Sequence, residues 1–198
     1  MRNKGFGGIV MATAVICEFN PFHNGHKYLL ESAKNVLKEP VIAIMSGSFT
    51  QRGEVAVCDK FVRAKSALEN GADLVLELPV VFSLSGAEGF AKAGVAIASA
   101  FDCTNHLAFG SESGDCELLK KSANAVCDEM VQALVRDGMK NGGYYPRELE
   151  NAVKTVFGDE ISSVLCEPNN ILGVEYIKAL NGTGAVSYTH LTLPTNSL

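Results

Sequence analysis

Two histidines flank a glycine at the point where an apolar segment gives way to a helical pattern. The apolar run over residues 13–17 is followed by Glu18-Phe19-Asn20-Pro21-Phe22-His23-Asn24-Gly25-His26. A glycine lets a phosphate approach the backbone, and the amino end of a helix adds N–H donors and partial positive charge. Two imidazoles there can donate hydrogen bonds to phosphate oxygens. The segment indicates a phosphate-binding loop; the alternative is an ordinary turn carrying two surface histidines.

Alternating apolar and helical segments must position this loop. Short apolar runs predict buried strands over residues 13–17, 41–45, 74–78 and 106–109. Helical spacing between them predicts helices over residues 26–37, 59–69 and 86–100. This alternation is typical of an α/β fold in which a parallel sheet carries helices on both faces. Ligands bind at the carboxyl ends of the strands in such sheets, and the histidine loop lies at that edge.

The pattern becomes helical after residue 115. Candidate helices span residues 115–137, 147–157 and 169–180, whereas the stretch 184–198 shows neither helical nor strand periodicity. We therefore expect an α/β domain followed by a helical segment.

Charge and cysteine usage narrow the possible partners. The chain of 198 residues has a formal net charge of -5, so RNA contact requires a local basic patch. Arg52, Lys60 and Arg63 are the candidates, with a solvated helix face as the alternative for each. The six cysteines include no C-x-x-C pair, which argues against a zinc knuckle, and their apolar contexts suggest buried thiols in a reducing cytoplasm. No apolar run reaches the roughly 18 residues that span a bilayer.

The histidine segment resembles the H-x-G-H motif of the nucleotidylyltransferase superfamily. Four further blocks follow it in order, over residues 45–54, 73–79, 109–112 and 168–173. Together the five blocks are similar to the bacterial tRNA(Met) cytidine acetate ligase family, over about residues 12–180. The resemblance implies a Rossmann-like nucleotidylyltransferase domain over that range. Residues 1–11 are then an N-terminal extension, and residues 181–198 are an atypical tail.

The resemblance also implies an activity. Members of that family adenylate acetate with ATP and pass the acetyl group to N4 of the wobble cytidine of elongator tRNA(Met). His23 and His26 would be the catalytic contacts to the phosphates, and Mg²⁺ is expected with the triphosphate. The metal ligands are not identified. The implied ATP-binding residues are Ile16, Cys17, Glu18, Phe19, Asn20, Pro21, Phe22, His23, Asn24, Gly25, His26, Lys27, Tyr28, Leu29, Gly110 and either Asn169 or Asn170.

The end of the chain departs from the family pattern. Family members are roughly twice as long and carry a second phosphate-binding motif, with Ser and Arg, just beyond the block at 168–173. Here no Lys or Arg follows Lys178, and residues 187–196 resemble translated sequencing-adapter read-through. We expect a chain truncated near residue 184 and a weakened activity. Two alternatives remain: transfer of AMP to another small acid or phosphate, and a non-catalytic module that binds nucleotide or RNA.

Overall fold

Five parallel strands form one sheet in the order β3-β2-β1-β4-β5. The computed structural model describes residues 11–183 and 189–194. The strands are β1 (Ala12–Cys17), β2 (Val41–Ser46), β3 (Leu74–Leu78), β4 (Thr104–Ser111) and β5 (Thr189–Pro194). β1 lies at the centre, so the loop that follows it opens between the carboxyl ends of β2 and β4. The predicted parallel sheet is confirmed.

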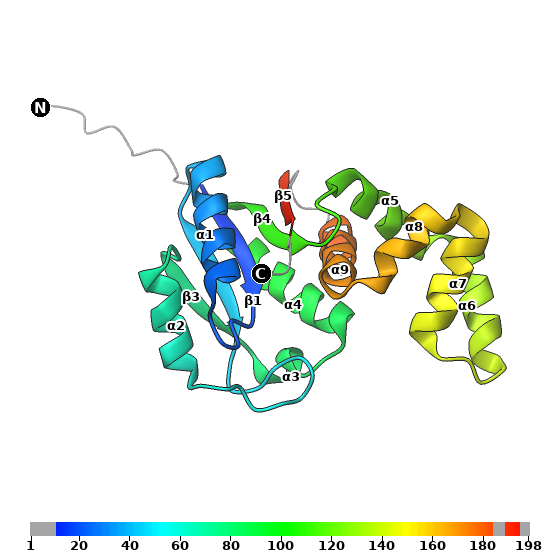
Figure 1. Ribbon diagram of the computed structural model, residues 1–198, viewed down its shortest axis with the longest axis horizontal. Coiled ribbons are helices and arrows are strands. Elements are labelled where there is room, and N and C mark those ends of the chain that lie inside the picture. Colours follow the sequence, from blue (N-terminus) through cyan, green and yellow to red (C-terminus); the bar gives the residue numbers. More distant parts are fainter. Residues whose placement is uncertain (1–10, 184–188, 195–198) are drawn as a thin grey trace, which may run out of the picture.

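Helices cover both faces of this sheet (Figure 1). Side chains alternate along β1: Val15 packs with Leu30 and Ala33 of α1 (Asn24–Leu37) and Ala67 of α2 (Lys60–Glu69). Ala14 and Ile16 point to the opposite cluster, with α4 (Ala87–Ser99) and α9 (Pro168–Thr183). Both faces are thus buried, as continuous apolar strands require.

The close approach of α4 to the sheet depends on Gly94. A Cβ added at this position would lie 2.6 Å from Ile16 Cδ1. Ile16 also lines the pocket described below. The small residues of α4 therefore help to fix the position of one side of that pocket. A short helix, α3 (Val80–Ser83), connects β3 to α4.

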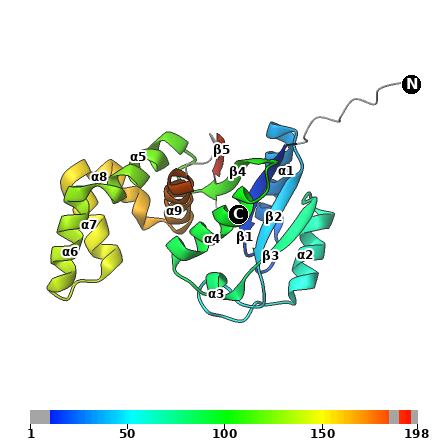
Figure 2. The same cartoon turned by 180° about the vertical axis from the view of Figure 1, so that it is seen from behind.

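The helical segment extends away from the sheet. It comprises α5 (Cys116–Cys127), α6 (Glu129–Lys140), α7 (Tyr145–Phe157), α8 (Asp159–Ser163) and the 3₁₀ turn η1 (Val164–Cys166). Seen from behind, α6 and α7 lie at the end of the molecule farthest from α1 and α2 (Figure 2). α5 packs on α9 and links the segment to the sheet. None of the described helices is long and apolar enough to cross a membrane.

Three sequence-based expectations are wrong, two of them about this half of the chain and one about the cysteines. The helix predicted over 115–137 is broken at Asp128, whose extended backbone ends α5 and whose carboxylate accepts from Met130 N and Val131 N to cap α6. The tail predicted to lack periodicity contains β5, which pairs in parallel with β4. The cysteines are not buried: Cys127 and Cys166 are exposed and the other four are half-buried. Residues 1–10, 184–188 and 195–198 of the predicted extension and tail lie outside the described residues.

Candidate functional site

A pocket of about 1260 Å³ opens at the carboxyl ends of β1 and β4, between the amino ends of α1 and α9. It brings together most of the residues that sequence reasoning assigned to ATP: Ile16, Cys17, Glu18, Phe19, Asn20, His23, Asn24, Gly25, His26, Tyr28, Leu29, Gly110 and Asn169. It does not bring in the rest of that set, which are Pro21, Phe22, Lys27 and Asn170. A parallel sheet is expected to bind its ligand at this edge.

The two histidines cap the amino end of α1 by reciprocal hydrogen bonds. His23 is the N-cap, and its Nδ1 accepts from Gly25 N at 3.1 Å. The backbone N–H of His23 donates in return to His26 Nδ1 at 3.4 Å. The two rings stack with their centroids 3.7 Å apart. Because each Nδ1 accepts a hydrogen bond, both neutral rings carry their proton on Nε2, which remains a donor for a ligand oxygen.

The environment of His26 keeps its ring neutral. Burial, followed by the repulsion that a positive charge on the neighbouring His23 ring would exert, lowers the pKa of His26 to about 4. Burial also raises the pKa of the Cys17 thiol and of the Tyr176 phenol in the same pocket. At neutral pH these three groups are uncharged, so they act as hydrogen-bond partners rather than as ions. A thiol held neutral in this way is a poor nucleophile.

The loop that carries the histidines is anchored to the loop after β2. Glu18 Oε1 accepts from Gln51 N at 2.6 Å, and Asn20 Oδ1 accepts from Val57 N at 2.7 Å. Phe19 has a left-handed backbone (φ 50°), and its buried ring lies 4.9 Å from the His26 ring. The ring of Phe19 therefore packs against the imidazole of His26 and fixes its position.

The amino end of α9 meets the same pocket but is closed by a carboxylate. Glu112 Oε2 accepts from Asn170 N at 2.9 Å. Glu112 Oε1 accepts from Asn169 N at 3.2 Å and from Asn169 Nδ2 at 2.8 Å. Pro168 begins the helix and has no N–H. The first free donors of α9 are thus satisfied by Glu112.

The two neighbouring asparagines have different environments. Asn169 lines the pocket, whereas Asn170 is 3% exposed. Asn170 Oδ1 accepts from Ser111 Oγ at 2.6 Å and from Ser113 N at 3.2 Å, which ties α9 to the loop after β4. The geometry therefore favours Asn169 as the ligand contact and gives Asn170 a structural role.

Seven further residues line the pocket without having been predicted as site residues: Gln51, Phe90, Phe109, Glu112, Glu167, Leu172 and Tyr176. Gln51 and Glu112 stand within family-like blocks, so the sequence carried a signal for them. The apolar members come from core faces, and only the packing of α4 and α9 on the sheet brings them to the ligand.

Arg63 does not contribute to the predicted basic patch. Arg63 is only 1% exposed, because its guanidinium binds backbone carbonyls inside the fold, and it is not available to RNA. Lys60 Nζ binds both carboxylate oxygens of Glu77 at 2.7–2.8 Å. Arg52 is exposed on the loop after β2. Sequence reasoning could not locate the backbone carbonyls that bind Arg63.

The comparisons with known proteins agree with this geometry. HIGH Nucleotidyl Transferase is the family that matches, over residues 10–189. The tRNA(Met) cytidine acetate ligase of Caldanaerobacter subterraneus subsp. tengcongensis is 44% identical over 173 residues, covering 85% of this chain and 43% of that protein. The same-named protein of Lysinibacillus sphaericus is 42% identical over 173 residues, with coverages of 85% and 43%. The chain thus spans less than half the length of these curated relatives.

A solved structure extends the likeness to three dimensions. The crystal structure of Thermotoga maritima TmcAL bound with alpha-thio ATP superposes with a TM-score of 0.84 at 39% identity, covering 92% of this chain and 46% of that one. The apo structure of the same protein has the same TM-score. The family match covers most of the chain. The letters HIGH in the family's name follow the H-x-G-H pattern that residues 23–26 also show. The chain belongs to the HIGH Nucleotidyl Transferase family.

Proposed function

We propose that the pocket binds ATP and that the chain forms the nucleotide-binding part of an ATP-dependent acetate–tRNA(Met) cytidine ligase. The observation that carries this proposal is the stacked His23–His26 pair at the amino end of α1, in a fold with a TM-score of 0.84 to a protein crystallised with alpha-thio ATP. Residues 12–180 would form the catalytic domain. Elongator tRNA(Met) would be the acceptor, which places the enzyme in the cytoplasm, where tRNA is found.

The proposed chemistry is that of the tRNA(Met) cytidine acetate ligases, and the groups that face the pocket can assist its first step. An acetate oxygen attacks the α-phosphorus of ATP, the bond to the bridging oxygen breaks, and pyrophosphate leaves with the electron pair. His23 and His26 donate from Nε2 to phosphate oxygens as negative charge moves onto the leaving group. Asn169 contacts the nucleotide, and Gly110 leaves room for it beside β4. In the second step N4 of the wobble cytidine attacks the acetyl carbon, and AMP leaves.

Magnesium fits this site as a companion of the nucleotide. Among the described residues, no group of three or more His, Cys, Asp or Glu side chains could hold a metal ion. Glu18 and Glu112 line the pocket, but both carboxylates accept backbone hydrogen bonds. Mg²⁺ binds mainly through substrate phosphates and water in many such sites, and it neutralises charge on the leaving pyrophosphate.

Arg52 and Lys60 remain the proposed RNA contacts.

Acetate-dependent exchange of ³²P between pyrophosphate and ATP tests the proposal. The assay is run on this chain and, as a positive control, on the full-length Caldanaerobacter relative. Exchange that requires acetate supports the proposed reaction. Exchange that requires a different acid or a phosphate acceptor contradicts it and indicates AMP transfer instead. ATP binding without exchange under any acid indicates a nucleotide-binding module.

A further inference from the structure

The candidate phosphate pocket has an unusual charge balance. The residues that line it include Glu18, Glu112 and Glu167, but no lysine or arginine. A triphosphate carries several negative charges, so a pocket of this composition needs positive potential from elsewhere. The amino end of α1 supplies part of it, because its N–H groups are capped by neutral imidazole rather than by a carboxylate.

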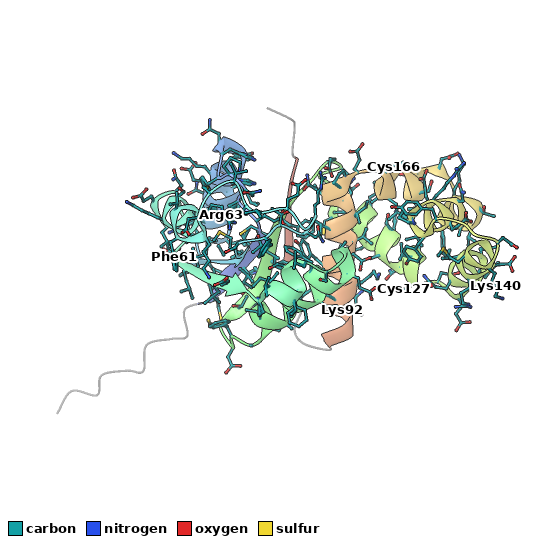
Figure 3. All side chains as sticks on the ribbon, turned by 90° about the horizontal axis from the view of Figure 1, so that it is seen from below. Phe61, Arg63, Lys92, Cys127, Lys140 and Cys166 are labelled. Carbon is teal, nitrogen blue, oxygen red and sulfur yellow. The ribbon has the colours of Figure 1, made fainter. Side chains whose placement is uncertain are left out.

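A buried guanidinium lies directly beneath the histidine loop. Arg63 Nη1 donates to Glu18 O at 2.5 Å and to Ser46 O at 3.2 Å, and Nε donates to Cys58 O at 3.2 Å. Nη2 donates to Gly47 O. The side chain thus joins the carboxyl end of β1, the carboxyl end of β2 and the start of α2. Figure 3 shows Arg63 in the α/β part of the molecule, away from the labelled helical residues Lys140 and Cys166.

The charge of Arg63 is not neutralised by a contacting carboxylate. Its partners are carbonyl oxygens, and none of the ion pairs found among the described residues includes it. The neighbouring carboxylates have other partners: Glu18 accepts from Gln51 N, and Glu77 pairs with Lys60. Arg63 is also the only charged residue among the described residues with less than 9% exposure. Transferring a charge from water into the protein interior costs free energy, so the presence of a buried arginine at this position requires a reason.

The field of this cation reaches the wall of the pocket. Burial raises the pKa of the Cys17 thiol, and the positive charge of Arg63 opposes that rise. Glu18, whose carbonyl Arg63 binds, also lines the pocket. A charge screened by little water acts over longer distances than one on the surface.

We propose that Arg63 is a positioning residue that draws the phosphates of ATP to the amino end of α1 from beneath the loop, without touching them. It also holds the carbonyls of Glu18, Ser46 and Gly47 turned inward, which keeps these acceptors away from the phosphates. This inference rests on the proposed ATP-binding function and assigns the pocket one source of positive charge within the described residues, in addition to the amino end of α1.

Affinity for ATP and for adenosine, measured by calorimetry and competition on this chain, separates the charge from the scaffold. Arg63→Gln keeps an N–H donor for the carbonyls but removes the charge. Arg63→Lys keeps the charge but loses the planar fork. Lys65→Gln is the matched control: it removes a cation two residues away on α2, with a side chain 75% exposed. We expect R63Q to weaken ATP binding about tenfold relative to adenosine, and R63K and K65Q to keep the wild-type ratio within about threefold.

Equal weakening of ATP and adenosine in R63Q would overturn the inference, because a purely structural role affects both ligands alike. If R63Q does not fold, as judged by circular dichroism, Arg63→Met takes its place, because it also removes the charge: a selective loss of ATP affinity supports the inference, and equal weakening of both ligands overturns it. Loss of the ATP preference in a folded R63K, which keeps the charge, would also contradict the role of charge. Failure of the proposed function has a different signature: exchange is absent although wild-type ATP binding and its ratio to adenosine are intact.

Discussion

Two helices present their amino ends to the same pocket, and they are closed in opposite ways. At α1 the caps are imidazoles: His23 Nδ1 accepts from Gly25 N, and His26 Nδ1 accepts from His23 N. At α9 the cap is the carboxylate of Glu112, which accepts from Asn169 N and Asn170 N. A neutral cap satisfies the N–H donors and leaves the positive end of the helix in place, whereas a carboxylate cancels it.

Under the proposed function, this difference assigns the two sides of the pocket to different parts of a nucleotide. The α1 side suits anionic phosphate. The α9 side presents acceptor oxygens and suits the hydroxyls of the ribose or an amino group. The contrast also explains how one pocket with two helix ends can orient a ligand that is charged at only one of its own ends.

The largest expected effect is at the α1 end. We expect His26→Ala to reduce acetate-dependent ATP–pyrophosphate exchange by about 10²–10³-fold, since removing one donor at a site of developing charge has effects of that order. The control is His106→Ala: His106 lies near the amino end of β4, where its Nδ1 binds Glu39 Oε2 at 2.8 Å. Exchange in the folded control should stay within threefold of wild type. A loss below tenfold in folded H26A would contradict the phosphate assignment.

The next largest effect separates the two asparagines at the α9 end. Asn170→Ala leaves Ser111 and Ser113 without a buried acceptor, so we expect the free energy of unfolding to fall by about 1–3 kcal/mol. Asn169→Ala should change unfolding by less than about 1 kcal/mol, while ATP affinity falls about three- to tenfold. Urea denaturation and calorimetry measure the two quantities. The reverse pattern would show that Asn170 is the ligand contact.

A pH effect is expected at the α1 end. The pKa of His26 is lowered from 6.5 to about 4 by burial and by His23, so the unfolded chain takes up a proton before the folded one does. Stability is therefore retained above pH 6.5 and lost as the pH falls toward 4. After discounting for solvent screening, we expect about 1–2 kcal/mol. The measurement is the difference in urea stability between wild type and His26→Gln, which should be smallest at the acidic limit; a constant difference would contradict it.

The smallest effect tests the carboxylate cap. Glu112→Gln removes one negative charge from the α9 end, and we expect inorganic pyrophosphate to bind about fivefold more tightly, in line with about 1 kcal/mol for one partly screened charge. Glu117→Gln is the control, since that exposed residue pairs with Lys120 on α5 and does not line the pocket. Calorimetry in both variants decides whether Glu112 excludes phosphate from this side. Unchanged pyrophosphate binding in E112Q would remove the distinction between the two helix ends.

The sequence predicted the elements that depend on local pattern. Apolar runs located β1 to β4, and the helix predicted over 59–69 is α2, which Asp59 caps by accepting from Phe61 N. Periodicity could not locate β5, because the pairing of that segment depends on the edge of β4 and not on its own pattern. It also missed the break at Asp128, since a capping aspartate within a long helical pattern also resembles a solvated side chain.

The site shows the same division. The histidine segment was recognisable because its residue types and its place after a strand carry the chemistry. Asn169 and Asn170 could not be separated, since neighbours on a helix point in different directions and only the docking of α9 decides which faces the pocket. Arg63 was misassigned to the surface because most of the carbonyls that bind it come from two distant segments of the chain, the ends of β1 and β2.

Phe19 makes the histidine loop dependent on the rest of the molecule. Its left-handed backbone costs roughly 1–2 kcal/mol, and only the burial of its ring offsets that cost. Glycine would relax the backbone but remove the ring beneath His26, and any other L-residue would keep the conflict. A peptide cut out over residues 12–37 would therefore not hold the two imidazoles in register. In evolution or design, the motif can be transplanted only together with the core that holds it.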